Sequence, residues 1–266
     1  MRFHIVTLFP EVVEAYTNAS ILGRAQKEGL LKVEAHQLRD FVASPAKPKS
    51  GKGEGKWFYK RVDERPYGGG PGMVLQAEPF VCAVETIEKN ISKLPKPSKT
   101  IKRSATSGLI YQSTIKATKK GSTGLKILIT AAGGKPLTNE YAKKLSKQSD
   151  VIILCGRYEG IDARVKKILA AQFGKAAVEE VSVGEYILTG GEVPALAIID
   201  ATARQIPGVL GKIESLEEGR VASHDVYTRP EIIEHGGKKY RVPKILLSGH
   251  HAQIDTLRSK KRSKPL

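Results

Sequence analysis

The sequence predicts an α/β protein whose sheet is mostly parallel. Strand and helix patterns alternate regularly in the second half of the chain, as in consecutive βα units. Three successive expected strands are each followed by a glycine-bearing loop. The expected strand at 151–155 is a continuous apolar run, which is typical of a parallel strand buried on both faces. At 266 residues the chain is long enough for one large domain or two ordinary ones.

The first half of the chain contains fewer regular elements. A strand is expected at 2–9, and a helix begins at Pro10 because proline is favoured at the first helical position. Residues 44–56 are rich in Pro, Gly, Ser and Lys and indicate a mobile loop. The other expected elements here are a helix at 21–28, a strand at 31–38, a helix at 78–91 and a strand pair around 101 and 110–115.

Regular alternation begins at residue 126. The expected elements are strands at 126–130, 151–155 and 177–183 and helices at 139–147 and 192–206. After Pro207-Gly208 the sequence becomes polar and irregular, which indicates a linker and a small C-terminal piece.

The net charge of +17 is concentrated in three segments. Residues 89–139 hold eleven Lys and Arg and no acid, residues 47–61 hold six basic residues and one acid, and residues 258–264 hold five basic residues and no acid. A local excess of this kind attracts a polyanion, so nucleic acid is favoured over the alternative of solvated lysines that aid solubility.

The composition also indicates the cellular compartment. No apolar run approaches the length of a membrane span, and the N-terminus does not have the pattern of a signal peptide. Only two cysteines occur, Cys82 and Cys155, so a disulfide framework or a cysteine-based zinc site is not expected. We therefore expect a cytoplasmic protein that does not bind membranes.

The three glycine-bearing loops, at 130–134, 155–160 and 183–191, are the strongest functional signal. The carboxyl ends of parallel strands meet at one edge of a sheet, where ligands bind. Together the loops predict a pocket whose backbone groups contact a purine-like ligand, although each loop alone is more often a plain turn. The chain has no GxxxxGK[ST] or GxGxxG motif, which argues against a P-loop enzyme and the usual dinucleotide fold.

Five motifs follow one another along the chain. They read Asp-Glu-Arg-Pro-Tyr-Gly-Gly-Gly-Pro-Gly-Met at 63–73, Cys-Gly-Arg-Tyr-Glu-Gly-Ile-Asp at 155–162, Tyr-Ile-Leu-Thr-Gly-Gly-Glu at 186–192, Ile-Pro-Gly-Val-Leu-Gly at 206–211 and Tyr-Thr-Arg-Pro at 227–230. In this order the chain resembles the bacterial tRNA (guanine-N1-)-methyltransferase family of the SPOUT superfamily. The resemblance covers about 1–88 and 127–251.

The resemblance implies a SPOUT-type fold whose C-terminal strands and loops form a trefoil knot. It implies S-adenosyl-L-methionine in the knot, Mg²⁺ as a probable requirement at a site the sequence does not reveal, and tRNA as substrate. The implied product is 1-methylguanosine immediately 3′ of the anticodon. It also implies a homodimer with its active site at the subunit interface.

The resemblance also assigns residues to the cofactor and substrate. The expected cofactor-binding residues are Thr130, Ala131, Gly133, Gly156, Tyr158, Glu159, Gly160, Val183, Gly184, Glu185, Tyr186, Ile187, Leu188, Gly190 and Gly191. The expected substrate-binding residues are Asp63, Arg65, Tyr67, Gly69 and Gly70, for which the alternative is a flexible hairpin.

Catalysis requires a base for the N1 proton of guanine and a cation for the charge that develops on O6. By resemblance Arg204 supplies the cation, with a helix-surface or interface salt bridge as the alternative. The family's usual Asp-Ser-Phe is absent from the linker, so Asp225 or Glu218 is the expected base, with a solvated acidic linker as the alternative.

The expected organisation is a methyltransferase domain at 1–211, a linker at 212–226 and a shortened tRNA-binding region at 227–266. Residues 94–125 are expected to be a basic insertion that helps to hold tRNA. Two other functions stay open: a non-catalytic RNA-binding protein with this fold, and a related SPOUT RNA methyltransferase with another target.

Overall fold

The structure, a computed structural model, describes residues 1–42, 60–93, 124–210, 226–250, 252–254 and 256. It divides into two compact units, Met1–Val209 and Leu210–Leu266, each of which is described by itself. The expected loop at 44–56, the strand pair around 101 and 110–115 and nearly all of the linker lie outside the described residues. The helices within the described ranges are all too short or too polar to cross a membrane.

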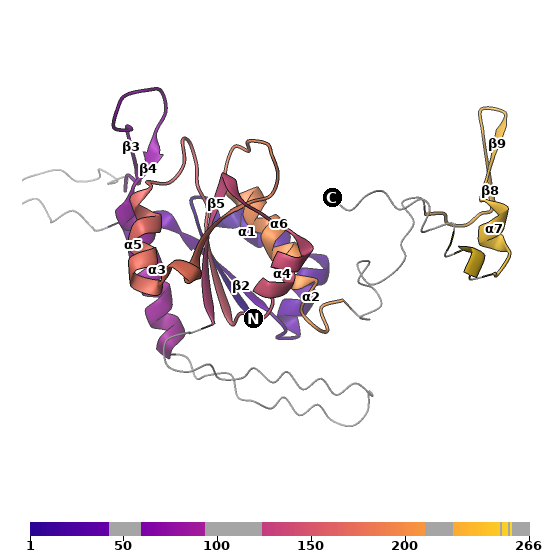
Figure 1. Ribbon diagram of the computed structural model, residues 1–266, viewed down its shortest axis with the longest axis horizontal. Helices are drawn as coiled ribbons and strands as arrows, with labels where there is room; N and C mark the ends of the chain where they lie inside the picture. Colours follow the sequence, from indigo (N-terminus) through magenta and orange to yellow (C-terminus); the bar gives the residue numbers. More distant parts are fainter. Residues whose placement is uncertain (43–59, 94–123, 211–225, 251, 255, 257–266) are drawn as a thin grey trace, which may run out of the picture. The chain divides into compact units, whose positions relative to one another are not determined.

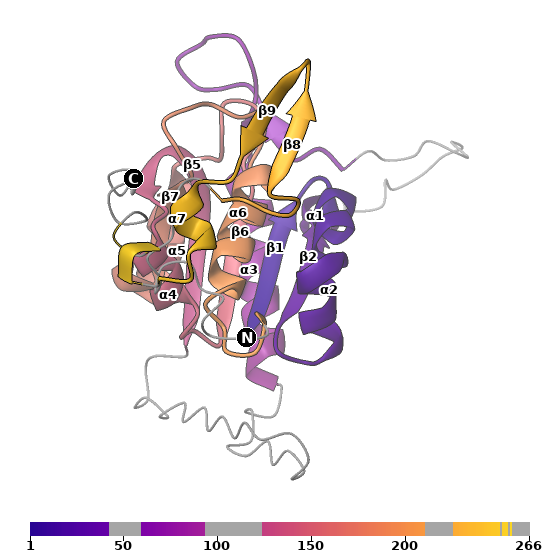
Figure 2. The same cartoon turned by 90° about the vertical axis from the view of Figure 1, so that its right-hand side faces the viewer.

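A five-stranded sheet forms the first unit, and the pairings between its strands are all parallel. The expected α/β class with a mostly parallel sheet is therefore confirmed. Across the sheet the strands are β2 (Lys32–Gln37), β1 (Arg2–Thr7), β6 (Asp150–Leu154), β5 (Leu125–Pro136) and β7 (Val178–Ser182) (Figures 1 and 2; all five are labelled in Figure 2).

Helices cover both faces of the sheet (Figures 1 and 2). One face packs against α1 (Pro10–Thr17), α2 (Ser20–Lys27), α4 (Asn139–Leu145) and α6 (Glu192–Ala203). The other packs against α3 (Ala77–Lys93) and α5 (Arg164–Phe173). Alternate residues of one strand serve the two cores: Val151 and Ile153 face the first group of helices, whereas Ile152 and Leu154 face the second.

Three elements differ from the sequence-based expectation. The chain continues in strand conformation from Leu125 to Pro136, through the expected first loop, with a register shift between Thr130 and Lys135 against β7. Helix α5 was not predicted, although its buried Val165 and Leu169 have helical i, i+4 spacing. Helix α6 ends at Ala203 rather than at 206.

Short elements join the main ones. The strands β3 (Asp63–Glu64) and β4 (Val74–Leu75) form an antiparallel pair. Two 3-10 turns, η1 (Leu38–Phe41) and η2 (Lys175–Ala177), follow β2 and precede β7.

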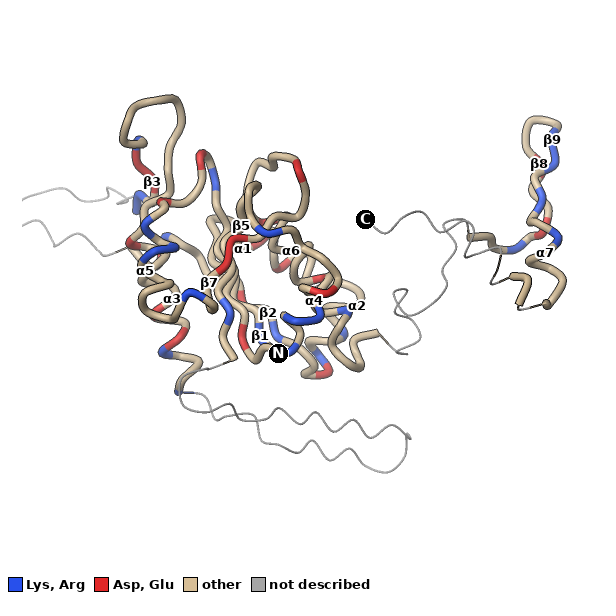
Figure 3. The backbone as a smooth tube through the Cα atoms, in the orientation of Figure 1, with Lys and Arg blue, Asp and Glu red and all other residues tan. Residues whose placement is uncertain are grey.

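The second unit contains a hairpin that the polar sequence did not predict. Strands β8 (Ile232–His235) and β9 (Lys238–Arg241) pair antiparallel around Gly236-Gly237, and α7 (Lys244–Leu247) follows. Both glycines have positive φ, as a two-residue hairpin turn requires. The backbone tube of β9 carries the blue of Lys and Arg in Figure 3, and Lys238, Lys239 and Arg241 of this strand are exposed.

Candidate functional site

The three glycine-bearing loops meet at the carboxyl edge of the sheet. The Thr130 hydroxyl donates to the Leu154 carbonyl at 3.1 Å and accepts from the Gly156 N–H at 3.3 Å. The Gly191 N–H donates to the Gly156 carbonyl at 2.8 Å, and an antiparallel bridge joins Arg157 to Gly190. Hydrogen bonds thus join all three loops directly.

Glycine is needed where these loops touch. A Cβ atom on Gly191 would lie 2.2 Å from the Thr130 hydroxyl oxygen and 2.7 Å from backbone atoms of Cys155 and Gly156. A Cβ atom on Gly134 would lie 2.6 Å from the Val181 nitrogen. Contacts this short would force the neighbouring backbone to move. The absence of side chains at these glycines therefore allows the loops to pack directly against one another.

A buried ion pair stabilises the same edge. The side chain of Glu192, at the start of α6, is 3% exposed, and its Oε2 lies 3.0 and 3.1 Å from two guanidinium nitrogens of Arg157. The Thr7 hydroxyl at the end of β1 donates to Oε1 of Glu192 at 2.6 Å. The Phe9 ring lies against the Arg157 guanidinium, 4.4 Å from ring centroid to Cζ. These contacts connect β1 to the second and third loops.

The one cysteine at this edge has no visible chemical role. Cys155 is fully buried; burial and the nearby Glu192 carboxylate, outweighing the opposing Arg157 charge, raise the pKa of its thiol well above the usual value. The thiol therefore stays protonated and packs as a small apolar group.

The Arg-Pro-Tyr-Gly-Gly-Gly-Pro-Gly segment connects β3 to β4 and is fastened to the second loop. The Glu159 N–H donates to the Met73 carbonyl, and the Leu75 N–H donates to the Gly160 carbonyl, both at 3.0 Å. Tyr67 at its tip is 99% exposed. The expected substrate segment thus adjoins the expected cofactor loops, and its tip is free to contact another molecule.

Apolar side chains are exposed on the third loop. They are Tyr186, Ile187 and Leu188, and Ile187 is 90% exposed; Val193 in the first turn of α6 is exposed as well. Tyr158 of the second loop is also exposed, with a positive φ of 57°. A concentration of exposed apolar side chains beside polar loop backbone fits an aromatic ligand or a protein partner.

Comparison with known proteins identifies the family. The family model described as tRNA (Guanine-1)-methyltransferase TrmD matches residues 1–265. The chain belongs to this family.

The names of curated relatives agree with this family assignment. Proteins named tRNA (guanine-N(1)-)-methyltransferase are 38% identical over 259 residues in Desulforamulus reducens and 37% identical over 262 residues in Ruminiclostridium cellulolyticum. These matches cover 96% and 97% of this chain and 81% and 89% of the relatives. The relative of the same name in Citrifermentans bemidjiense is 34% identical over 266 residues, covering 98% of this chain and 85% of that protein.

Arg204, the expected cation of the methyltransferase, lies far from the loops of its own chain. Helix α6 begins at the loops with Glu192 and runs for 12 residues, about 18 Å, to end just before Arg204. Beyond it, a Cβ atom on Gly208 would lie 3.5 Å from Leu30, which lies just before β2 begins, at the amino edge of the sheet. Among the described residues no hydrogen bond or ion pair engages the Arg204 guanidinium.

The described residues test neither the expected base nor the expected metal. Asp225 and Glu218 both lie outside the described residues. Within the described ranges, the group of three neighbouring side chains able to hold a metal is His4, Glu34 and His36, which lies on β1 and β2 rather than at the loops. No group of three such side chains occurs among the described residues of the loop edge.

Sequence reasoning missed the residues that hold the loop edge together. Arg157 and Glu192 were part of the motifs, but no role was predicted for either, and Thr7 was read only as part of a strand. The available signal was a charged pair inside two glycine motifs that were expected to meet. Buried polar side chains need hydrogen-bond or ion-pair partners, and Arg157 and Glu192 form such a pair.

Proposed function

We propose that this protein transfers a methyl group from S-adenosyl-L-methionine to N1 of the guanine immediately 3′ of the anticodon in tRNA. The observation that carries the proposal is the direct joining of three glycine loops at one edge of the sheet in a member of this family. No described feature favours the RNA-binding or other-target alternatives over this one.

The loops fit the cofactor through backbone groups and exposed apolar side chains. When bound, S-adenosylmethionine supplies an electrophilic methyl group on sulfur. The 130–134, 155–160 and 183–191 loops would hold it, with Ile187 and Leu188 able to cover an adenine ring. The fastened second loop and the Arg157–Glu192 pair keep these backbone groups in place without reorganisation.

The remaining chemistry concerns one proton and one developing charge. Asp225 or Glu218 accepts the N1 proton of guanine, which gives N1 a lone pair for in-line attack. Arg204 stabilises the negative charge that then develops on O6. Asp63, Arg65 and the Tyr67–Gly70 tip contact the nucleotide. No step is assigned to Mg²⁺, which we retain as a proposed requirement only.

The position of Arg204 supports a homodimer. One chain carries its loops and its Arg204 at opposite ends of α6, about 18 Å apart. A second copy, placed in the opposite direction, brings its own Arg204 to these loops and also covers their exposed apolar side chains. We propose that each active site is completed in this way, and that the loops lie within a trefoil knot.

Contact with tRNA is assigned to basic surfaces. The exposed β9 residues Lys238, Lys239 and Arg241 belong to the second unit. The basic insertion lies outside the described residues apart from residues 124 and 125. If it grips tRNA, deletion of 97–122 weakens binding and flattens its salt dependence; an unchanged affinity and salt slope would contradict this role.

The first experiment measures label transfer from S-adenosylmethionine to tRNA transcripts that carry guanine or adenine 3′ of the anticodon. Transfer to the guanine form alone supports the proposal. Binding of cofactor and RNA without transfer would instead support the non-catalytic alternative. Asp225→Asn and Glu218→Gln identify the base: if both variants retain wild-type transfer, neither acid is the base.

A second experiment tests the shared site. Arg204→Ala chains are co-expressed with Gly190→Ala chains, in which a Cβ would lie 2.3 Å from Nε of Arg157, once the latter are shown not to bind cofactor. Each homodimer is then inactive. If Arg204 acts across the interface, random mixing restores about a quarter of the wild-type rate; no restoration means that Arg204 acts within its own chain.

A further inference from the structure

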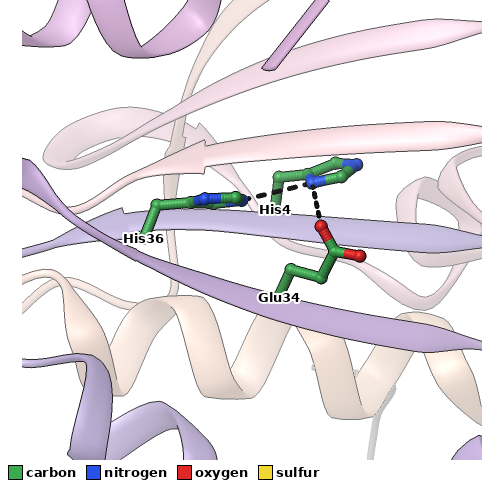
Figure 4. A group of neighbouring side chains, drawn as sticks. All are labelled: His4, Glu34 and His36. Carbon is green, nitrogen blue, oxygen red and sulfur yellow. Dashed lines mark hydrogen bonds and ion pairs between the residues drawn. The ribbon is translucent and has the colours of Figure 1, made fainter. Parts of the chain in front are cut away.

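Two histidines and a glutamate meet on the β1–β2 strand pair, away from the loops (Figure 4). Parallel pairing sets His4 directly beside Glu34, and His36 follows two residues later on the same face. Nδ1 of His4 lies 3.4 Å from Oε2 of Glu34 and 3.3 Å from Nε2 of His36. One ring nitrogen thus faces two other ligand atoms.

Whether Nδ1 of His4 can bind a metal depends on whether the other ring nitrogen, Nε2, carries the proton. His4 is 4% exposed, and its Nε2 lies 3.6 Å from Oδ1 of Asp150, with no hydrogen-bond partner at normal distance. Asp150 is buried and held by Arg2 at 2.6 and 3.1 Å. When the proton is on Nε2, facing that carboxylate, Nδ1 presents a lone pair to Glu34 and His36.

In that tautomer Nδ1 of His4 and Oε2 of Glu34 are two acceptors 3.4 Å apart, and a cation between them satisfies both. In a tetrahedral site with metal–ligand distances of about 2.0–2.1 Å, neighbouring ligand atoms lie about 3.3–3.4 Å apart. The two separations from Nδ1 match these edges.

We propose that His4, Glu34 and His36 bind a divalent transition-metal ion, with Zn²⁺ as the matching cation. Asp150 serves as the outer carboxylate that orients His4, an arrangement common around zinc-bound histidines. Imidazole nitrogens suit zinc and not Mg²⁺, so this site is separate from any Mg²⁺ requirement of methyl transfer.

The surroundings leave room for an ion to enter. The Glu34 side chain is one-third exposed and the chain is half-buried along most of β2, the strand at the end of the sheet. Lys32 contacts the other carboxylate oxygen of Glu34, Oε1, and leaves Oε2 to the site. Burial, outweighing the opposing Glu34 charge, lowers the pKa of His36. The fourth position is left to water, and the ion joins β1 to β2.

Zinc titration of the metal-free full chain tests the site, with calorimetry for stoichiometry and Co²⁺ absorption for geometry. We expect one ion per chain with a tetrahedral Co²⁺ spectrum. Glu34→Gln and His36→Gln should each weaken binding at least about 10-fold. His235→Gln, an exposed histidine on β8, is the matched control and should bind as wild type.

His250 and His251 are neighbours in sequence and offer an unrelated zinc site, so the decisive background is a chain with both changed to Gln. Binding must persist there. The thermal midpoint should rise by about 5 °C with excess Zn²⁺ in this background, and not after Glu34→Gln or His36→Gln is added. The absence of saturable binding, its loss with His250 and His251, or its survival in the Glu34→Gln and His36→Gln chains would overturn the proposal.

Discussion

We call the edge of the sheet where the three loops meet the loop edge, and the side chains around His4, Glu34 and Asp150 the β1–β2 face. Each region contains a buried carboxylate beside an arginine, yet the two are built differently. At the loop edge, Arg157 comes from the second loop and Glu192 from the start of α6, directly after the third loop, and these loops are packed without space for a Cβ atom on Gly191. On the β1–β2 face, Asp150 and Arg2 come from paired strands, and the side chains around them are open to solvent on one side. Close packing makes the first region sensitive to any change of shape, whereas the second is sensitive to charge.

The largest expected effect comes from removing the cation of the loop edge. Arg157→Met leaves the Glu192 carboxylate buried without its partner, and we expect a loss of about 4 kcal/mol in the free energy of unfolding. Urea unfolding measures it. Arg164→Met is the control, because that side chain is exposed and its bond to Asp162 lies at the surface. Equal effects of the two changes would contradict the importance of the buried pair.

The next effect tests packing alone. Gly191→Ala keeps an ordinary backbone conformation but puts a Cβ within 2.7 Å of two neighbouring loops, so we expect a loss of about 3 kcal/mol. The control is Gly133→Ala, where a Cβ would meet nothing within 4 Å. Should both substitutions leave the urea midpoint unchanged, the loop edge is looser than the contacts indicate.

The third effect concerns charge on the β1–β2 face. Burial would raise the pKa of Asp150, but its contacts with His4, Arg2 and Ser149 outweigh burial and lower the pKa to about 2. Because the folded pKa is lower than the unfolded one, the stabilisation is complete above about pH 4 and is lost as the pH falls through about 2. It amounts to about 2 kcal/mol.

Acid titration of stability in wild type and Asp150→Asn measures this contribution. The wild-type curve should fall more steeply between pH 4 and pH 2, and the two curves should converge at the acid end. Parallel curves would mean that the Asp150 contacts contribute nothing.

The smallest expected effect comes from removing an exposed charge at the surface of the β1–β2 face. Lys32 is two-thirds exposed, so Lys32→Met should change the free energy of unfolding by less than about 0.5 kcal/mol despite its contact with Glu34. Thermal and urea unfolding both report it. A loss as large as that from Asp150→Asn would show that charge acts across the whole face.

Much of the fold was predictable because apolar patterning reports burial directly. The continuous run Val151–Leu154 identified a central strand, and Pro10 and the 78–91 pattern located helices. The prediction failed where the pattern was short or polar. Helix α5 shows only two buried side chains, and the β8–β9 hairpin exposes nearly all of its residues.

The candidate site was predicted to the extent that glycine motifs follow strands. The loops around Thr130, Gly156 and Gly191 were expected to meet, and they do. The roles given to individual cofactor, substrate and catalytic residues stay predictions. Arg204 was expected on the helix that begins at Glu192, whereas this helix ends at Ala203 and Arg204 directly follows it.

By itself the sequence determined the fold class, the family and the loops that carry its chemistry, because each is written in local pattern: apolar runs, glycines and motif order. Only the tertiary structure decided which distant side chains meet. Thr7 with Glu192, and His4 with Glu34 and His36, are brought together by the order and register of parallel strands. Register is set by the packing of whole strands against the core, so no local stretch of sequence encodes these contacts.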